Sequence, residues 1–97
     1  MRRVSIKRQE ELRQYHGLIE RLGHRSELSG KPSGDHHHIA GRSGKRLVNP
    51  FNIICLTREE HDYEGAHHTW ERQRELLAIV KPIRIAQGFR AEDYPQL

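Results

Sequence analysis

Histidine is the residue type with the clearest chemical potential in this chain. Eight of the 97 residues are His, and His36, His37 and His38 are consecutive. Asn52 and then His61 follow within 25 residues, in one contiguous segment. A neutral imidazole offers a lone pair to a divalent metal ion such as zinc, nickel or manganese. The order of these residues therefore predicts a site where imidazoles from separate elements converge.

Two short strands and a helix must position these side chains. Residues 37–41 favour a short strand, and the apolar run 51–56, FNIICL, is the best strand candidate in the chain. Thr57 followed three residues later by Glu60 forms a capping box, which predicts the start of a helix that carries His61.

Two further helices are expected on the flanks. Residues 5–22 have apolar side chains at helical spacing, with Ser5 as the predicted N-cap and Gly23 as the predicted stop. Residues 69–80 form a second helical stretch, which the sequence predicts to end at Pro82.

The surroundings of four other side chains can also be predicted. Trp70 shares the apolar face of the last helix, which favours the core over a surface that stacks against nucleic-acid bases. Asp62 and Glu64 are expected in solvent. Cys55 lies within an apolar strand, which predicts an inert buried thiol.

Composition and charge limit the class of protein. A chain of 97 residues with strand and helix patterns indicates one small α+β domain. One cysteine excludes an intrachain disulfide and a Cys-rich zinc site. Because there is neither a long apolar run nor an apolar signal core, we expect no membrane span and a cytoplasmic protein. Residues 1–58 carry a net charge of +7 and residues 59–97 carry −3, with 13 Arg overall, which suits a polyanionic partner.

The segment HHIAGRSGKRLVNPFNIICLTREEH, residues 37–61, resembles the HNH endonucleases. Their catalytic unit is the ββα-metal, or His-Me finger, motif. Its layout matches here as His37-His38-Ile39, Asn52-Ile53-Ile54-Cys55-Leu56 and His61. The resemblance implies a single HNH domain over 1–97, with a helix at 5–22, the ββα-metal core at 35–68, and a helix and tail at 69–97.

The resemblance also implies roles for the histidines. His38 would act as general base, and His37 and His61 would hold one divalent cation (Mg, Mn, Ni or Zn). His68 is a candidate for an additional ligand, seven residues after His61. Asn52 matches the family's central Asn, which braces the loop and helps to orient the base.

Residues around this core have supporting assignments. Arg42, Lys45 and Arg46 are candidates for DNA-phosphate contacts. Asp35 is expected to orient a ligand histidine or to cap a turn. His36 is either a surface residue or a further ligand. A shifted register, in which His36 and His37 act as ligand and base, is the alternative.

Many relatives surround this core with two Cys-x-x-Cys pairs that bind a structural zinc. Here Ser26 and Ser29 occupy the first pair of positions, and Arg58 and Glu60 lie where the second is expected. The resemblance therefore implies a zinc-less member in which apolar packing of the flanking helices holds the motif. It also suggests DNA as the partner, with a homodimer, or a phage packaging or mobile-element protein, as further partners.

Two other functions compete with DNA hydrolysis. A non-catalytic DNA-binding module would have the same fold without activity. A structural zinc domain would use His37 and His61 with His68 or His36 as ligands.

Overall fold

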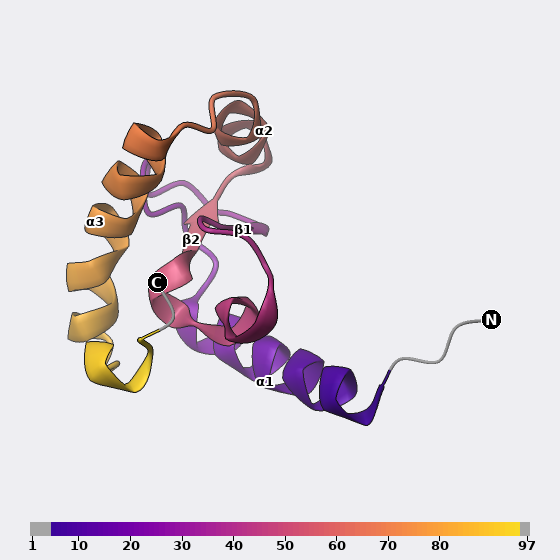
Figure 1. Ribbon diagram of the computed structural model, residues 1–97. Coiled ribbons are helices and arrows are strands. Elements are labelled where there is room, and N and C mark those ends of the chain that lie inside the picture. The colour runs from indigo at the N-terminus through magenta and orange to yellow at the C-terminus, as the bar shows by residue number, and fades with distance from the viewer. Residues whose placement is uncertain (1–4, 96–97) are drawn as a thin grey trace.

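The computed structural model describes residues 5–95 and has an α+β fold (Figure 1). A two-stranded sheet lies at the centre, with α3 along one side, α1 below and α2 above. The helices and strands, in chain order, are α1 (Ile6–Leu22), β1 (Asp35–His38), β2 (Ile53–Leu56), α2 (Arg58–Ala66) and α3 (Trp70–Ala86). Within residues 5–95, no helix combines the length and apolar character needed to cross a membrane.

The two strands pair antiparallel, with Asp35 opposite Leu56 and His38 opposite Ile53. The first strand is displaced towards the N-terminus from the predicted range 37–41, and the second is shorter than the predicted 51–56. The first begins at Asp35 and ends at His38, and residues 50–52 form a 3-10 turn before the second. Pro50 has a fixed φ that suits this turn, and the Asn49 side chain caps it by accepting a bond from Phe51 N at 2.9 Å.

The predicted starts of α1 and α2 are confirmed. Ser5 Oγ accepts a hydrogen bond from Arg8 N at 3.1 Å, and Gly23 ends α1 with a φ of 89°. At α2, Thr57 Oγ1 accepts from Glu60 N at 3.2 Å, while the Glu60 carboxylate accepts from Thr57 N at 2.8 Å. These caps satisfy backbone groups that a helix leaves without partners.

The predicted end of α3 at Pro82 is wrong, because the helix continues to Ala86. Proline removes one backbone hydrogen bond within a helix, at a cost of about 3 kcal/mol. Val80 and Arg84, on either side of it, are fully buried. Packing on both sides therefore holds the helix through a residue that would end an isolated one.

The core forms two layers because side chains of β2 alternate between the faces of the sheet. One layer faces α1 and consists of Leu18, Leu22, Phe51, Ile53, Cys55 and Phe89. The other faces α3 and consists of Ile39, Ile54, Leu56, Leu76 and Val80. Cys55 is buried, as predicted, and burial raises the pKa of its thiol to about 12.

Two predicted environments are wrong. Trp70 is 73% exposed instead of buried in the core. Glu64 is only 2% exposed instead of solvated, and its carboxylate accepts hydrogen bonds from Nε and Nη2 of Arg72 at 2.6–3.1 Å. This pair ties the first turn of α3 to α2, and the Trp ring at the helix start is left outside.

A second buried ion pair joins α3 to the turn that follows α1. Arg84 is fully buried and contacts Glu27 at 2.5 Å. The same guanidinium donates to the carbonyls of Pro50 and Ile53, each at 2.8 Å. The two strands are thus held by a polar network as well as by the apolar packing that the sequence predicts.

The turn at 25–32 contains Ser26 and Ser29, which occupy the positions where HNH nucleases often have a Cys-x-x-Cys pair. Ser26 Oγ accepts from Leu28 N and Ser29 N at 3.1 and 3.0 Å. The Ser26 and Ser29 side chains also hydrogen-bond the Glu60 carboxylate. Hydrogen bonds to a carboxylate therefore connect this turn to α2.

Candidate functional site

The two faces of β1 separate its histidines. Residues that alternate along a strand point to opposite faces. Asp35 and His37 point to the side of α2, where they contact His61. His36 and His38 point to the side of α1, where they contact Gly23 and Tyr15 respectively.

His37 is the centre of a histidine cluster between β1 and the end of α2. Its ring lies 5.1 Å from the His61 ring and 6.5 Å from the His68 ring, centroid to centroid. Its Nε2 atom is buried and has no hydrogen-bond partner among residues 5–95. Burial, together with the neighbouring His61 and His68, lowers the pKa of His37 to about 4. The ring is therefore neutral at pH 7, the state in which it can bind a metal.

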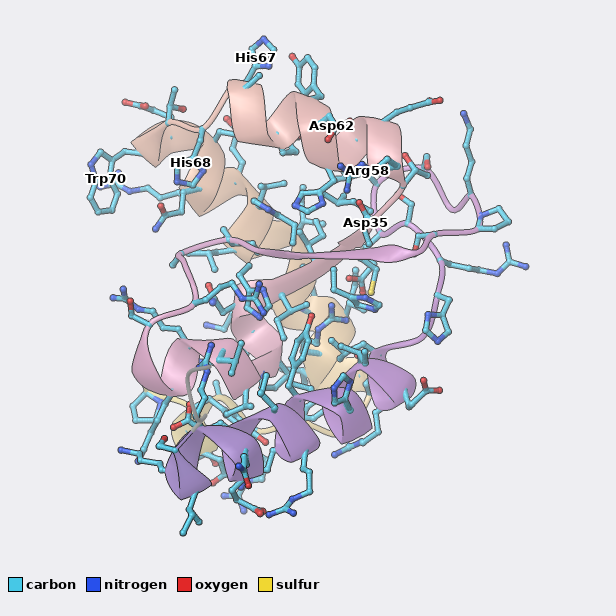
Figure 2. The ribbon with its side chains drawn as sticks, turned by 90° about the vertical axis from the view of Figure 1, so that its right-hand side faces the viewer. Asp35, Arg58, Asp62, His67, His68 and Trp70 are labelled. Carbon is cyan, nitrogen blue, oxygen red and sulfur yellow. The ribbon has the colours of Figure 1, made fainter. Side chains whose placement is uncertain are left out.

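The second histidine of the cluster is oriented by a carboxylate. His61 Nδ1 donates a hydrogen bond to Asp35 Oδ2 at 2.9 Å, which leaves Nε2 of the same ring to act as a ligand. That hydrogen bond, with help from the Arg58 charge, lowers the pKa of Asp35. Arg58 Nη1 also contacts Asp35 Oδ2, at 3.4 Å. Figure 2 shows Arg58 and Asp35 together below the first turn of α2.

His38 lies at the end of β1 with one ring nitrogen already engaged. Nε2 lies 3.1 Å from the carbonyl oxygen of Leu47. Because a carbonyl only accepts, Nε2 carries the proton and Nδ1 of the neutral ring is left with its lone pair. Burial lowers the pKa of His38, and the charges of Arg42 and His61 lower it further. The Tyr15 ring of α1 packs 5.3 Å from the imidazole and restricts its position.

Asn52 closes the loop that follows β1. Its Oδ1 accepts from Ala40 N at 2.7 Å, and its Nδ2 donates to the carbonyls of Gly41 and Arg46 at 2.9 and 3.0 Å. The side chain is fully buried. Leu47, whose carbonyl accepts from His38, comes directly after this braced loop, so Asn52 connects to His38 through the backbone.

The three predicted phosphate-binding residues lie on this loop and are exposed. Arg42 extends over the Tyr15 ring, with its guanidinium carbon 6.0 Å from the ring centre. Arg46 reaches back to the Ala40 carbonyl at 3.4 Å. Lys45 is exposed in the 3-10 turn that follows. Their positive charges therefore lie on the same loop that positions His38.

Two predicted contributors are placed differently. The Nε2 atom of His36 lies 3.2 Å from the Gly23 carbonyl, and the ring packs edge-on against His24, so His36 does not join the cluster around His37. His68 does not follow His61 on one helix face, because α2 ends at Ala66. The turn into α3 nevertheless brings its ring close to His37.

The donor atoms of the cluster determine which kind of metal site it could form. Residues 5–95 contain no group of three or more His, Cys, Asp or Glu side chains that could hold a metal ion. This finding counts against the structural zinc domain, which needs about four protein ligands. Two imidazole nitrogens, from His37 and His61, do suit a catalytic cation whose other positions are taken by water and substrate.

Three neighbours of these histidines were not predicted from the sequence. Tyr15 belongs to the apolar face predicted for residues 5–22, Arg58 stands where a cysteine is expected, and nothing in the sequence indicates the Leu47 carbonyl. Arg58 directly follows the predicted N-cap Thr57, so its place in the first turn of this helix can be predicted from the sequence. The other two depend on how the chain folds back on itself.

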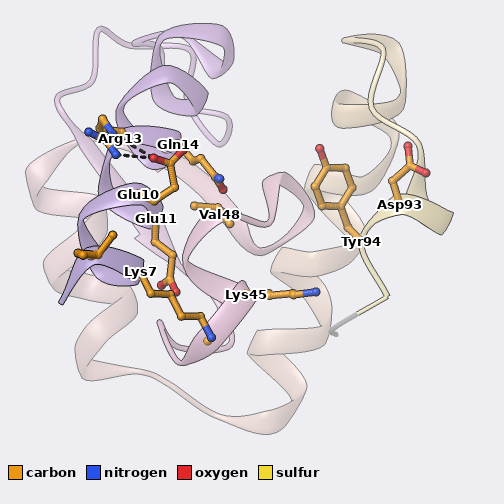
Figure 3. Close-up of a pocket in the computed structure, with 11 residues that line it drawn as sticks. Lys7, Glu10, Glu11, Arg13, Gln14, Lys45, Val48, Asp93 and Tyr94 are labelled. Carbon is orange, nitrogen blue, oxygen red and sulfur yellow. Dashed lines mark hydrogen bonds and ion pairs between the residues drawn. The ribbon is translucent and has the colours of Figure 1, made fainter.

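A separate groove lies between the start of α1 and the C-terminal segment (Figure 3). It is lined by charged residues such as Lys7, Glu10 and Lys45, together with Val48 and Tyr94. None of the histidines in the cluster around His37 lines this groove, so the groove is separate from the candidate site.

Comparison of the chain with protein-family models, curated proteins and solved structures gives no match. The functional argument therefore depends on the residues of the site.

Proposed function

We propose that this protein is a metal-dependent nuclease of the HNH type that hydrolyses phosphodiester bonds in DNA. The observation that carries the proposal is the state of three histidines. The base candidate His38 has its proton fixed on Nε2, His61 is oriented by Asp35, and His37 keeps a buried nitrogen that no group in residues 5–95 engages.

His38 is suited to accept a proton from water. The Leu47 carbonyl accepts from Nε2–H, so Nδ1 is the atom that would accept the proton, and the lowered pKa favours the neutral ring. A positioned general base of this kind contributes about 10²–10⁴-fold to the rate. Tyr15 limits rotation of the ring, and Asn52 limits movement of the Leu47 carbonyl.

His37 and His61 would hold one divalent cation by their Nε2 atoms. Such a cation supplies positive charge to the scissile phosphate and to the leaving 3′ oxygen. Asp35 keeps the His61 ring in the tautomer that leaves Nε2 available. His68 contributes a nearby imidazole and is an auxiliary ligand at most.

The positive loop would bind the DNA backbone. Arg42, Lys45 and Arg46 are exposed next to His38, and guanidinium groups match the geometry of phosphate oxygens. Arg58 lies on the other side of the cluster and is a further candidate for a phosphate contact. Such an enzyme would act in the cytoplasm of a bacterial or phage-infected cell, and two copies would let a one-site domain cut both strands.

A plasmid-nicking assay tests the proposal. The wild-type chain should convert supercoiled plasmid to the nicked form with Mg²⁺, Mn²⁺, Ni²⁺ or Zn²⁺, and a chelator should stop the reaction. His38→Ala should lower the rate by about 10²–10⁴-fold with unchanged circular dichroism.

His67→Ala is the matched control for this assay. His67 is an exposed histidine that points away from the cluster in Figure 2, so its removal should leave nicking unchanged. Wild-type protein that stays inert with all four metals, on supercoiled, linear and single-stranded DNA, would contradict the proposal. Equal activity of wild type and His38→Ala would contradict the role of His38.

A further inference from the structure

Trp70 is a large aromatic side chain that the fold leaves in solvent. Its side chain occupies the first position of α3 and is 73% exposed. An indole buries a large apolar area when it packs into a core, and this one contributes little to folding. Exposed tryptophans are therefore candidates for contacts with a ligand or partner.

The position of Trp70 connects it to the histidine cluster. It follows His68 by two residues, so the two Cα atoms are at most about 7 Å apart. The His68 ring lies 6.5 Å from His37. In Figure 2, the rings of His68 and Trp70 both lie below the end of α2, on the side of β1, whereas His67 projects above it.

The backbone that carries Trp70 is held in place from both sides. Thr69 caps α3 by accepting a hydrogen bond from Arg72 N at 3.1 Å. The Arg72 side chain is in turn bound to the buried Glu64 of α2, with the shortest contact at 2.6 Å. The backbone that presents the indole is thus fixed, which lowers the conformational entropy lost when a flat group packs against the ring.

We infer that Trp70 stacks against an unpaired base next to the scissile phosphate, so that the substrate is single-stranded DNA or a junction with unpaired bases. This inference rests on the proposed function. In a closed duplex the faces of the bases are covered by their neighbours, and only an unpaired base offers one to an indole. The phosphate bound at His37 and His61 would bring the adjacent base within reach of the ring.

The intrinsic fluorescence of the protein reports this contact directly, because Trp70 is the single tryptophan of the chain. The titration uses the His38→Ala variant in Mg²⁺, so that DNA is bound without being cut. A single-stranded oligonucleotide should quench the emission saturably, and the blunt duplex of the same sequence should not. In anisotropy measurements with labelled DNA, adding Trp70→Ala should weaken single-strand binding by about 5- to 100-fold, and Trp70→Phe should recover part of the loss.

Tyr63→Ala is the matched control. Tyr63 is 57% exposed and stacks on His67 at 4.0 Å, so its loss should leave single-strand affinity unchanged. Absence of quenching, or an equal loss of single-strand and duplex binding in Trp70→Ala, would overturn the inference. A dimer seen by sedimentation for the wild type and lost in Trp70→Ala would also overturn it, and would assign Trp70 to a contact between two copies.

The nicking assay separates this inference from the proposed function. If the wild type nicks plasmid but single strands do not quench Trp70, the inference fails and the nuclease proposal stands. If quenching and the selective loss occur but no DNA is cut with any of the four metals, the stacking site stands and the nuclease proposal fails.

Discussion

Two polar clusters lie next to the small sheet, and they differ in how completely their groups are paired. Arg84, which is fully buried, binds Glu27 and two backbone carbonyls. His37 is partly buried, and its Nε2 atom meets no hydrogen-bonding group of residues 5–95. A buried polar atom without a partner costs about 1–3 kcal/mol. The first cluster therefore stabilises the fold, whereas the second carries a cost that a bound ligand would remove.

The largest effect should come from breaking the paired cluster. Arg84→Met leaves the Glu27 carboxylate without its buried partner, so the free energy of unfolding should fall by about 3–5 kcal/mol in urea denaturation. Arg90→Met removes an exposed arginine that pairs with exposed Glu92, and it should change stability by less than about 1 kcal/mol. Similar losses in the two variants would contradict the assignment of Arg84 as the stabilising residue.

A smaller effect is expected at the edge of the unpaired cluster. Asp35→Asn weakens the acceptor that orients His61, so affinity for Mn²⁺ or Zn²⁺ should fall by about 10–100-fold in calorimetry. Asp62→Asn also removes a carboxylate near Arg58, at 3.6 Å, but it leaves His61 Nδ1 engaged. Equal metal affinity in Asp35→Asn and wild type would show that His61 needs no orienting group.

The smallest effect concerns Glu60, which connects the turn at 25–32 to α2, and it depends on pH. Partial burial raises the pKa of Glu60, but hydrogen bonds from Ser26, Thr57 and Ser29 together bring it to about 2, below its usual 4.5. A lowered folded-state pKa stabilises the protein above the unfolded pKa, and this stabilisation is lost as the pH falls towards the folded value. The free energy of unfolding of the wild type should exceed that of Glu60→Gln by about 1 kcal/mol at pH 6, and this difference should vanish near pH 2. A difference independent of pH would contradict the role of the charge.

The sequence predicts well those features that depend on a few neighbouring residues. Ser5, Thr57 and Glu60 lie where their caps form, because a cap is decided within one helical turn. Strand and helix limits were less accurate where distant packing competes with local preference. Pro82 stays within α3 because buried residues on both sides hold the helix. Trp70 is exposed although its spacing along the helix matches the apolar face, because the first turn of α3 lies at the edge of the core.

The spacing of the histidines indicates which residues form the candidate site, but not which face of β1 each side chain occupies. The three consecutive histidines allow two registers. In the fold, Asp35 and His37 face α2, and His36 turns to the Gly23 carbonyl. That choice follows from the pairing of β1 with β2, which buries Ile54 and Leu56 against α3.

By itself, the sequence determined the types of group available: several imidazoles, an Asn directly before the second strand, a basic loop and two capped helices. Those features are local, since a cap or a charge is a property of adjacent residues. Tertiary structure alone decided which nitrogen of His38 carries the proton, which carboxylate orients His61, and that Trp70 is exposed. Each of these depends on contacts between residues far apart in the chain, as when Leu47 meets His38 or Asp35 meets His61.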